Sequence, residues 1–187
     1  LVREIVPATF GTRAIVGVVP DGSAAIVTAS KDPREQHVWR VPLGGSGAAT
    51  GAPEPLTSGG GVHTAVADHG VVVISSALRE GGAATTAIAA DRSRHELPDV
   101  AEQPTLVPTS RLESVEIGGN TFYTAITRPR AFKAGERYPV LLKVYGGPSA
   151  QMVVDYRDSY VLDQWYADAG FIVVRADNRG TPHRSRS

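Results

Sequence analysis

The chain has 187 residues, enough for one domain or two small ones, and its 42% of apolar residues permits a packed core. Its 19 Lys and Arg residues balance 19 Asp and Glu residues, and the resulting zero net charge argues against nucleic acid or an anionic membrane as the main partner. The absence of Cys excludes disulfides, zinc–thiolate centres and cysteine nucleophiles, and no apolar run approaches the roughly 20 residues that a membrane-spanning helix needs.

The first part of the chain, to about residue 107, has the pattern of short strands separated by turns. Asp21-Gly22 between two apolar runs is a strong hairpin signal. The expected strands are Ile15–Val19, Ala24–Ala29, His37–Val41, Val62–Val66, Val71–Ser75 and Thr85–Ala89. This spacing, without helical periodicity, predicts an all-β sandwich or propeller and fits about two propeller blades of roughly 40–50 residues each.

The pattern changes after a proline-punctuated stretch that contains Pro98, Pro104 and Pro108. A further β-hairpin is predicted where Gly118-Gly119-Asn120 separates Leu112–Ile117 from Thr121–Thr127. Further on, two apolar runs, Val140–Tyr145 and Phe171–Val174, predict strands buried on both faces.

A helix is expected between these two runs, over Ser159–Ala169, with Gly170 after its end. Its apolar face would consist of Val161, Leu162, Trp165 and Ala169. A strand–helix–strand unit implies that the two strands are parallel, as in an α/β fold.

The most informative stretch is Tyr138–Pro148, where an apolar run ends in Tyr145, Gly146, Gly147 and Pro148. Glycine permits a sharp turn and proline stops the strand. A tyrosine hydroxyl and backbone N–H groups therefore gather at the carboxyl end of a parallel strand, where open α/β sheets bind ligands. From spacing alone, the favoured interpretation is that Tyr145 is a strand-end aromatic whose hydroxyl faces water.

Two sets of motifs carry a family resemblance. The first set is Ala29-Ser30-Lys31-Asp32-Pro33, His37-Val38-Trp39-Arg40-Val41 and Glu54–His63, and the second, more specific set is Tyr138–Pro148 and Asp177-Asn178-Arg179-Gly180-Thr181-Pro182. In these motifs the chain resembles the dipeptidyl peptidase IV branch of the prolyl oligopeptidase family over most of its length. The resemblance implies the last blades of a β-propeller over residues 1–107. It also implies the N-terminal strands and first helix of an α/β-hydrolase domain over residues 108–187, truncated before the nucleophile.

The resemblance further implies a serine peptidase that releases N-terminal dipeptides, with Pro or Ala at the second position, and uses no cofactor or metal. Tyr145 matches the family's oxyanion-hole tyrosine. The family's serine motif and its catalytic Asp and His lie beyond this chain, and its amine-binding glutamates lie in an earlier propeller segment. The 187-residue chain alone is therefore predicted to be inactive, and it needs the rest of the polypeptide to complete the hydrolase sheet. The full-length protein is expected to be a homodimer.

Other reactive side chains have plainer interpretations. The histidines His37, His63, His69, His95 and His183 lack zinc-ligand spacing, and His63 and His69 are expected in loops. The serines Ser75, Ser76, Ser110 and Ser114 lack Gly-x-Ser-x-Gly context. Asp177-Asn178-Arg179-Gly180 is expected to brace neighbouring loops rather than to take part in chemistry.

Two other functions remain open on sequence grounds. One is a non-catalytic β-rich binding or scaffold module, and the other is acylaminoacyl or oligopeptide cleavage within the same family. The Ala, Gly and Arg bias predicts a bacterial source, with a cytoplasmic, periplasmic or secreted location. Both chain ends are expected to be cuts in a longer polypeptide, since the first residue is Leu1 rather than Met.

Overall fold

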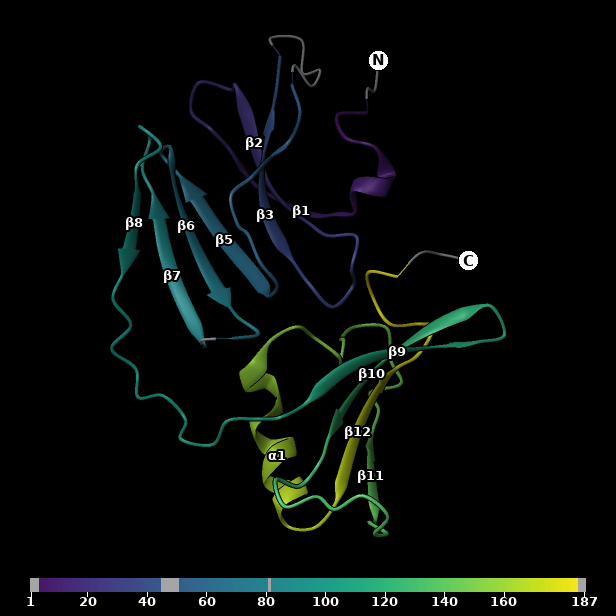
Figure 1. Cartoon of the computed structure of the whole chain (residues 1–187). Coiled ribbons are helices and arrows are strands. Elements are labelled where there is room, and N and C mark those ends of the chain that lie inside the picture. The colour runs from purple at the N-terminus through teal and green to yellow at the C-terminus, as the bar shows by residue number, and fades with distance from the viewer. Residues whose placement is uncertain (1–3, 45–50, 81, 185–187) are drawn as a thin grey trace. The chain divides into compact units, whose positions relative to one another are not determined.

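The computed structural model describes residues 4–44, 51–80 and 82–184. The two extreme ends, which the sequence predicts to be cuts, lie outside these residues. The chain forms two compact units, Leu1–Ala101 and Glu102–Ser187. Figure 1 shows the first unit in purple to teal and the second in green to yellow.

The first unit consists of two four-stranded antiparallel sheets, each a meander in which neighbours in sequence are neighbours in space (Figure 1). A short 3-10 helix, η1 (Ala8–Phe10), precedes them. The first sheet contains β1 (Thr12–Val18), β2 (Ala24–Ala29), β3 (His37–Pro42) and β4 (Glu54–Pro55). The second contains β5 (Val62–Asp68), β6 (Val71–Ala77), β7 (Ala83–Ile88) and β8 (Arg94–Leu97).

The main core of this unit joins the two sheets. Ile26 and Val38 from the first sheet, with Leu56 directly after β4, cluster with Val72, Ile74 and Ile88 from the second sheet. Main-chain bonds add to this contact, because the Gln36 N–H donates to the Gly61 carbonyl at 3.1 Å and the His63 N–H donates to the Gln36 carbonyl at 2.9 Å. The two meanders are thus held by apolar burial and by backbone pairing.

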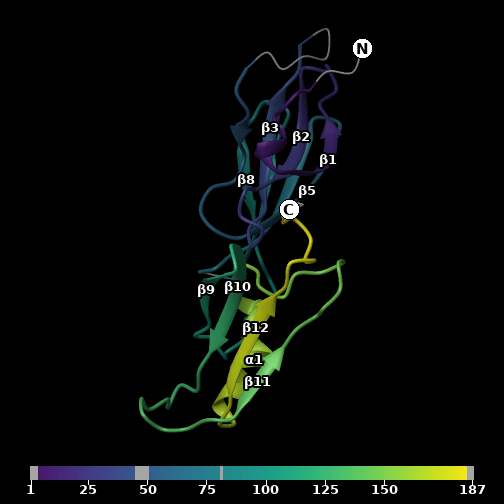
Figure 2. The ribbon, with the colours of Figure 1, turned by 90° about the vertical axis from the view of Figure 1, so that its right-hand side faces the viewer.

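The second unit is built on a mixed sheet with the strand order β11-β12-β10-β9. Its strands are β9 (Arg111–Ile117), β10 (Asn120–Thr127), β11 (Val140–Lys143) and β12 (Ile172–Asp177). β11 and β12 are parallel, as predicted, and β10 is antiparallel to both of its neighbours. The 3-10 helix η2 (Arg157–Tyr160) leads into α1 (Val161–Asp168), which contacts β12 and β10 (Figure 2).

The expected strands are all present, with small differences at their ends. Gly118 and Gly119 form the two-residue turn of the β9–β10 hairpin, both with positive φ, which only glycine adopts without cost. The sequence did not predict β4 and β8, because β4 has two residues and β8 is a polar stretch, Arg94-His95-Glu96-Leu97.

Two burial predictions for the second unit are wrong. β11 is not buried on both faces, since Val140 and Leu142 are 62% and 59% exposed. Two of the apolar residues expected on the buried face of α1, Leu162 and Trp165, are exposed, whereas Asp163 and Gln164 are fully buried. The polar residues are buried because each has partners beneath the helix, as described below.

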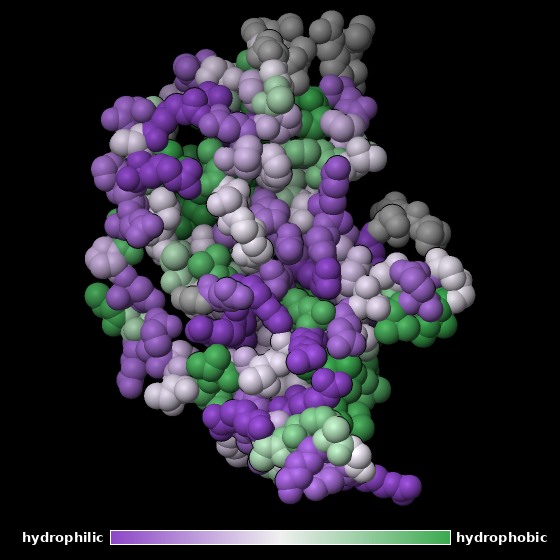
Figure 3. Space-filling model, in the orientation of Figure 1, coloured by the Kyte–Doolittle hydropathy of each residue, from purple (hydrophilic) through white to green (hydrophobic). Residues whose placement is uncertain are grey.

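One face of this mixed sheet is apolar and open. Alternation along the strands places Val140 and Leu142 on the face opposite α1, together with Val115 and Ile117 of β9. Figure 3 shows apolar side chains gathered along this part of the second unit. No helix in the described part of the chain is long and apolar enough to cross a membrane.

Candidate functional site

The predicted site lies where β11 and β12 end. In this parallel pair Lys143 is opposite Arg175, so Tyr145 and Asp177, each two residues further on, follow at the same edge of the sheet. Tyr145 is 50% exposed, and its hydroxyl has no hydrogen-bond partner among the described residues. A phenol O–H with no internal partner is available as a donor to a bound group.

The turn after Tyr145 depends on its two glycines. Gly146 has φ +75°, in the left-handed region, and so reverses the chain immediately after the strand. As a result, the ring of Tyr145 lies against Gly147. The position of the tyrosine ring is therefore set by the backbone that directly follows it.

Asp177 holds the loop that follows this turn. Its carboxylate accepts hydrogen bonds from the N–H groups of Met152 and Val153, at 2.8 Å and 3.1 Å, and its side chain is buried. Burial raises the pKa of Asp177, while these two N–H groups act in the opposite direction. The structure agrees with the prediction that this motif braces a neighbouring loop.

Arg175 anchors the same loop at two further points. Its guanidinium donates to the Met152 carbonyl at 3.1 Å, to Ser159 Oγ at 3.1 Å and to the Ser159 carbonyl at 2.6 Å. It also lies over the ring of Tyr160, 4.6 Å from the ring centre. Asp177 and Arg175, both on β12, thus anchor the loop that follows Tyr145.

A buried carboxylate completes this network. Asp163 of α1 is fully buried and forms ion pairs with Lys143 of β11 and Arg175 of β12. The neighbouring Gln164 accepts from the Thr109 N–H at 2.8 Å and donates to the Arg128 carbonyl at 3.2 Å. These residues were not predicted from the sequence, although it carries a signal for them: one basic residue at matching positions of two apolar strands, with an acidic residue on the helix between the strands.

The remaining residues of the Asp177–Gly180 motif shape their own turn. Asn178 Oδ1 accepts from the Gly180 N–H at 2.9 Å, and the Asn178 carbonyl accepts from Thr181 Oγ1 at 2.8 Å. Arg179 is exposed. These contacts stabilise the chain where it leaves β12.

The prediction that His63 lies in a loop is wrong. His63 belongs to β5, is 2% exposed, and stacks against His37 of β3 with the ring centres 5.5 Å apart. Its Nδ1 lies 2.8 Å from Ser76 Oγ, and its Nε2 has no hydrogen-bond partner among the described residues. Burial, with a smaller contribution from His37, lowers the pKa of His63 from 6.5 to about 4. His63 is therefore a neutral interior residue at neutral pH.

Two serine–histidine contacts in the first unit resemble parts of a catalytic triad without its geometry. His63 contacts Ser76, but no carboxylate orients the buried imidazole. Ser93 Oγ lies 3.0 Å from His95 Nε2 and donates to Asp91 at 2.6 Å, so the serine stands between the acid and the histidine. A nucleophile needs the histidine in that middle position, so neither group is a candidate.

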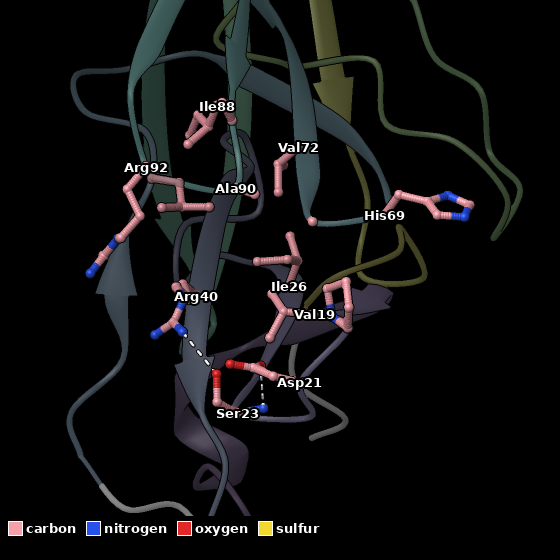
Figure 4. Close-up of a pocket in the computed structure, with 14 residues that line it drawn as sticks. Val19, Asp21, Ser23, Ile26, Arg40, His69, Val72, Ile88, Ala90 and Arg92 are labelled. Atoms are coloured by element: carbon pink, nitrogen blue, oxygen red, sulfur yellow. Dashed lines mark hydrogen bonds between the residues drawn. The ribbon is translucent and has the colours of Figure 1, made fainter.

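A pocket of about 310 Å³ also lies between the two sheets of the first unit (Figure 4). Ile26, Val72 and Ile88 contribute to its apolar wall. At its rim, Arg40 donates to Ser23 Oγ at 3.3 Å, and Arg92 pairs with Glu54 outside the pocket. Figure 4 shows the His69 ring directed away from the cavity. Since these rim groups have partners or point elsewhere, the pocket contains no evident reactive group.

Comparison with known proteins shows which proteins this chain is similar to. The chain is 30% identical over 174 residues to the probable dipeptidyl-aminopeptidase B of Aspergillus clavatus, and 30% identical over 178 residues to dipeptidyl-aminopeptidase B of Aspergillus niger, in each case over 88% of this chain and 19% of the relative. The chain resembles dipeptidyl peptidase IV-type proteins. The resemblance inferred from the motifs is therefore confirmed.

Solved structures show the same likeness at the level of the fold. A putative dipeptidyl aminopeptidase IV from Bacteroides ovatus matches 97% of this chain with a TM-score of 0.80, and dipeptidyl peptidase 4 from Porphyromonas gingivalis matches 97% with a TM-score of 0.77. Both are 18% identical to this chain, which covers 27% and 26% of them. No family model matches the sequence.

The chain spans about a fifth of the length of the curated relatives it matches. Those relatives are fungal, whereas the two solved structures are bacterial, so the bacterial source remains a prediction.

Proposed function

We propose that this chain is a segment of a serine-type dipeptidyl peptidase and that it supplies the oxyanion-hole tyrosine, Tyr145. In this proposal the two four-stranded meanders are consecutive propeller blades. The mixed sheet with α1 is the beginning of an α/β-hydrolase domain. The similarity to dipeptidyl-aminopeptidase B supports the peptidase class, and the assignment of Tyr145 rests on its match to the family's motif together with its geometry.

The observation that carries the proposal is the placement of the Tyr145 hydroxyl. It follows a strand of a parallel pair and has no internal hydrogen-bond partner among the described residues. Attack on a peptide carbonyl develops negative charge on the carbonyl oxygen, and a fixed donor at that point lowers the barrier. A half-exposed phenol on a braced loop meets this requirement, because its ring can pack while its hydroxyl remains accessible.

The described residues indicate which parts of a serine peptidase active site this chain would provide. The described residues offer a donor for the oxyanion but no serine with an oriented histidine. In this proposal the nucleophile, its base and the groups that bind the substrate amine come from other parts of the polypeptide. The open apolar sheet face and the exposed Leu162 and Trp165 of α1 are surfaces on which such polypeptide can pack.

The first test is the reading frame on either side of these 187 codons. We expect a Gly-x-Ser-x-Gly motif downstream, followed by an Asp and then a His, and amine-binding glutamates upstream. The complete polypeptide should release dipeptides from substrates with Pro or Ala in the second position. A continuous frame without the serine motif would instead favour a scaffold function, and a frame without the glutamates would favour another peptidase specificity.

The second test addresses Tyr145 directly in the complete polypeptide. Tyr145→Phe should lower kcat by about 10²–10³-fold, the cost of removing one oxyanion-hole donor, with little change in KM. Tyr138→Phe is a suitable control, because its hydroxyl bonds to Lys133 and Glu136 within its own loop. A Tyr145→Phe enzyme with unchanged kcat, or with the loss confined to KM, would refute the assignment.

A further inference from the structure

The ring of Tyr145 occupies the space in which a side chain at position 147 would begin. A Cβ atom on Gly147 would lie 2.7 Å from Cε1, 3.1 Å from Cζ and 3.3 Å from the hydroxyl oxygen of Tyr145. Carbon atoms pack at about 3.5–4.0 Å, so the ring would have to move by roughly 0.8 Å or more. The displaced part includes the hydroxyl itself.

The two glycines of this turn therefore have different reasons to be glycine. Gly146 has φ +75°, and no atom lies within 4 Å of the place where its Cβ would be, so its requirement comes from the backbone conformation. Gly147 has no left-handed φ, and its requirement is the space taken by Tyr145. A substitution at Gly147 consequently acts on the neighbouring ring and not on the turn.

We propose that Gly147 is a positioning residue for the Tyr145 hydroxyl. This inference rests on the proposed function, in which that hydroxyl donates to the oxyanion. By leaving the ring room to fold back over the turn, Gly147 permits the position that the hydroxyl occupies. An oxyanion donor works at about 2.7–3.1 Å, and a misplacement of about 1 Å can lower a rate by about 10²-fold.

The surroundings of Tyr145 predict that activity and stability respond differently to this change. The ring is 50% exposed, and its hydroxyl has no partner among the described residues, so the ring can move without breaking an internal contact. Gly147→Ala should thus move the donor while leaving the thermal unfolding midpoint unchanged. If glycine were instead required for its backbone conformation, the substitution would lower the unfolding midpoint.

The experiment is a double-mutant cycle in the complete peptidase with Tyr145→Phe, Gly147→Ala and both changes together. We expect Gly147→Ala to lower kcat by about 10²-fold with little change in KM, and to have no further effect when Tyr145 is already Phe. Gly180→Ala is the matched control, since its Cβ would meet only Asn178 Oδ1 at an ordinary 3.5 Å and should leave kcat unchanged.

A spectroscopic readout reports the ring itself. The tyrosines of the complete peptidase can be replaced by 3-fluorotyrosine, and the Tyr145 signal assigned by its loss in Tyr145→Phe. The ¹⁹F resonance of Tyr145 should shift in Gly147→Ala and not in Gly180→Ala. An unmoved resonance, a wild-type kcat in Gly147→Ala, or losses that multiply in the double variant would each overturn the inference. If Tyr145→Phe alone leaves kcat unchanged, the proposed role of Tyr145 fails first, and the inference falls with it.

Discussion

Acidification should weaken the first unit because of His63. The imidazole is buried between the sheets, beside His37 of β3 and Ser76 of β6, with Glu35 the nearest compensating charge. In the unfolded chain it takes up a proton below about pH 6.5, and in the folded chain only near pH 4. Between these values the unfolded state binds more protons, so the free energy of unfolding falls as the pH falls.

The size of the effect follows from the two pKa values of His63. Each pH unit of the window is worth about 1.4 kcal/mol, so the loss reaches about 2 kcal/mol at pH 5 and about 3 kcal/mol below pH 4. Above pH 6.5 the contribution vanishes, because His63 is neutral in both states. A loss of 2 kcal/mol is a large fraction of the stability of a typical domain.

Urea unfolding followed by tryptophan fluorescence can measure this loss. The chain has two tryptophans, so in a Trp165→Phe background Trp39 reports on the first unit alone. Lowering the pH from 7.5 to 5 should reduce the free energy of unfolding of the Trp165→Phe protein. The reduction should be about 2 kcal/mol larger than in the Trp165→Phe, His63→Phe double variant, which lacks the imidazole. His95→Gln, a change on the exposed strand β8, should keep the parent pH dependence. Parallel losses in the parent and the His63→Phe protein would show that burial of this imidazole is not the cause.

Three further outcomes test the packing. Asp163→Ala should destabilise the second unit by about 3–5 kcal/mol, because it leaves Arg175 buried without its carboxylate, whereas Glu136→Ala breaks an exposed pair with Lys133 and should cost less than about 1 kcal/mol; similar losses in chemical unfolding would contradict this. Leu142 lies on the exposed apolar face of edge strand β11, a surface through which the isolated chain can self-associate. Leu142→Lys should therefore lower the mass measured by size-exclusion chromatography with light scattering. An unchanged mass would show that this face does not mediate self-association. Arg92 has φ +71°, so Arg92→Ala keeps the backbone strain that Arg92→Gly removes, and the Ala protein should be the less stable by about 1 kcal/mol; equal stabilities would refute the strain.

The local signals in the sequence predicted the strands and their pairing well. Asp21-Gly22 and Gly118-Gly119 mark hairpins because their backbone conformations favour glycine or aspartate, and this preference is local. The two apolar runs Val140–Tyr145 and Phe171–Val174 likewise predicted the parallel pair. Tyr145 could be singled out because it stands where such a strand ends.

Burial in the second unit could not be predicted in the same way. Apolar composition indicates that Leu142 and Trp165 will be covered, but not by which part of a polypeptide, and in this chain they are exposed. Asp163 was missed for the opposite reason, since a carboxylate is expected outside unless its partners are known. Those partners, Lys143 and Arg175, come from separate strands and meet it only in the folded unit.

The polar network and the open apolar face of the second unit have separate roles in the proposed active site. Asp177 and Arg175 of β12 fix the loop beyond Tyr145 through contacts made within this chain. The exposed face formed by residues such as Val140 and Leu142 has no covering element among the described residues. Because the loop contacts do not depend on that face, the loop that follows Tyr145, the proposed oxyanion donor, can form before the remaining polypeptide packs. In the proposed enzyme, packing of that polypeptide would then bring the nucleophile to a loop that is already formed, which reduces the reorganisation needed at the moment of reaction.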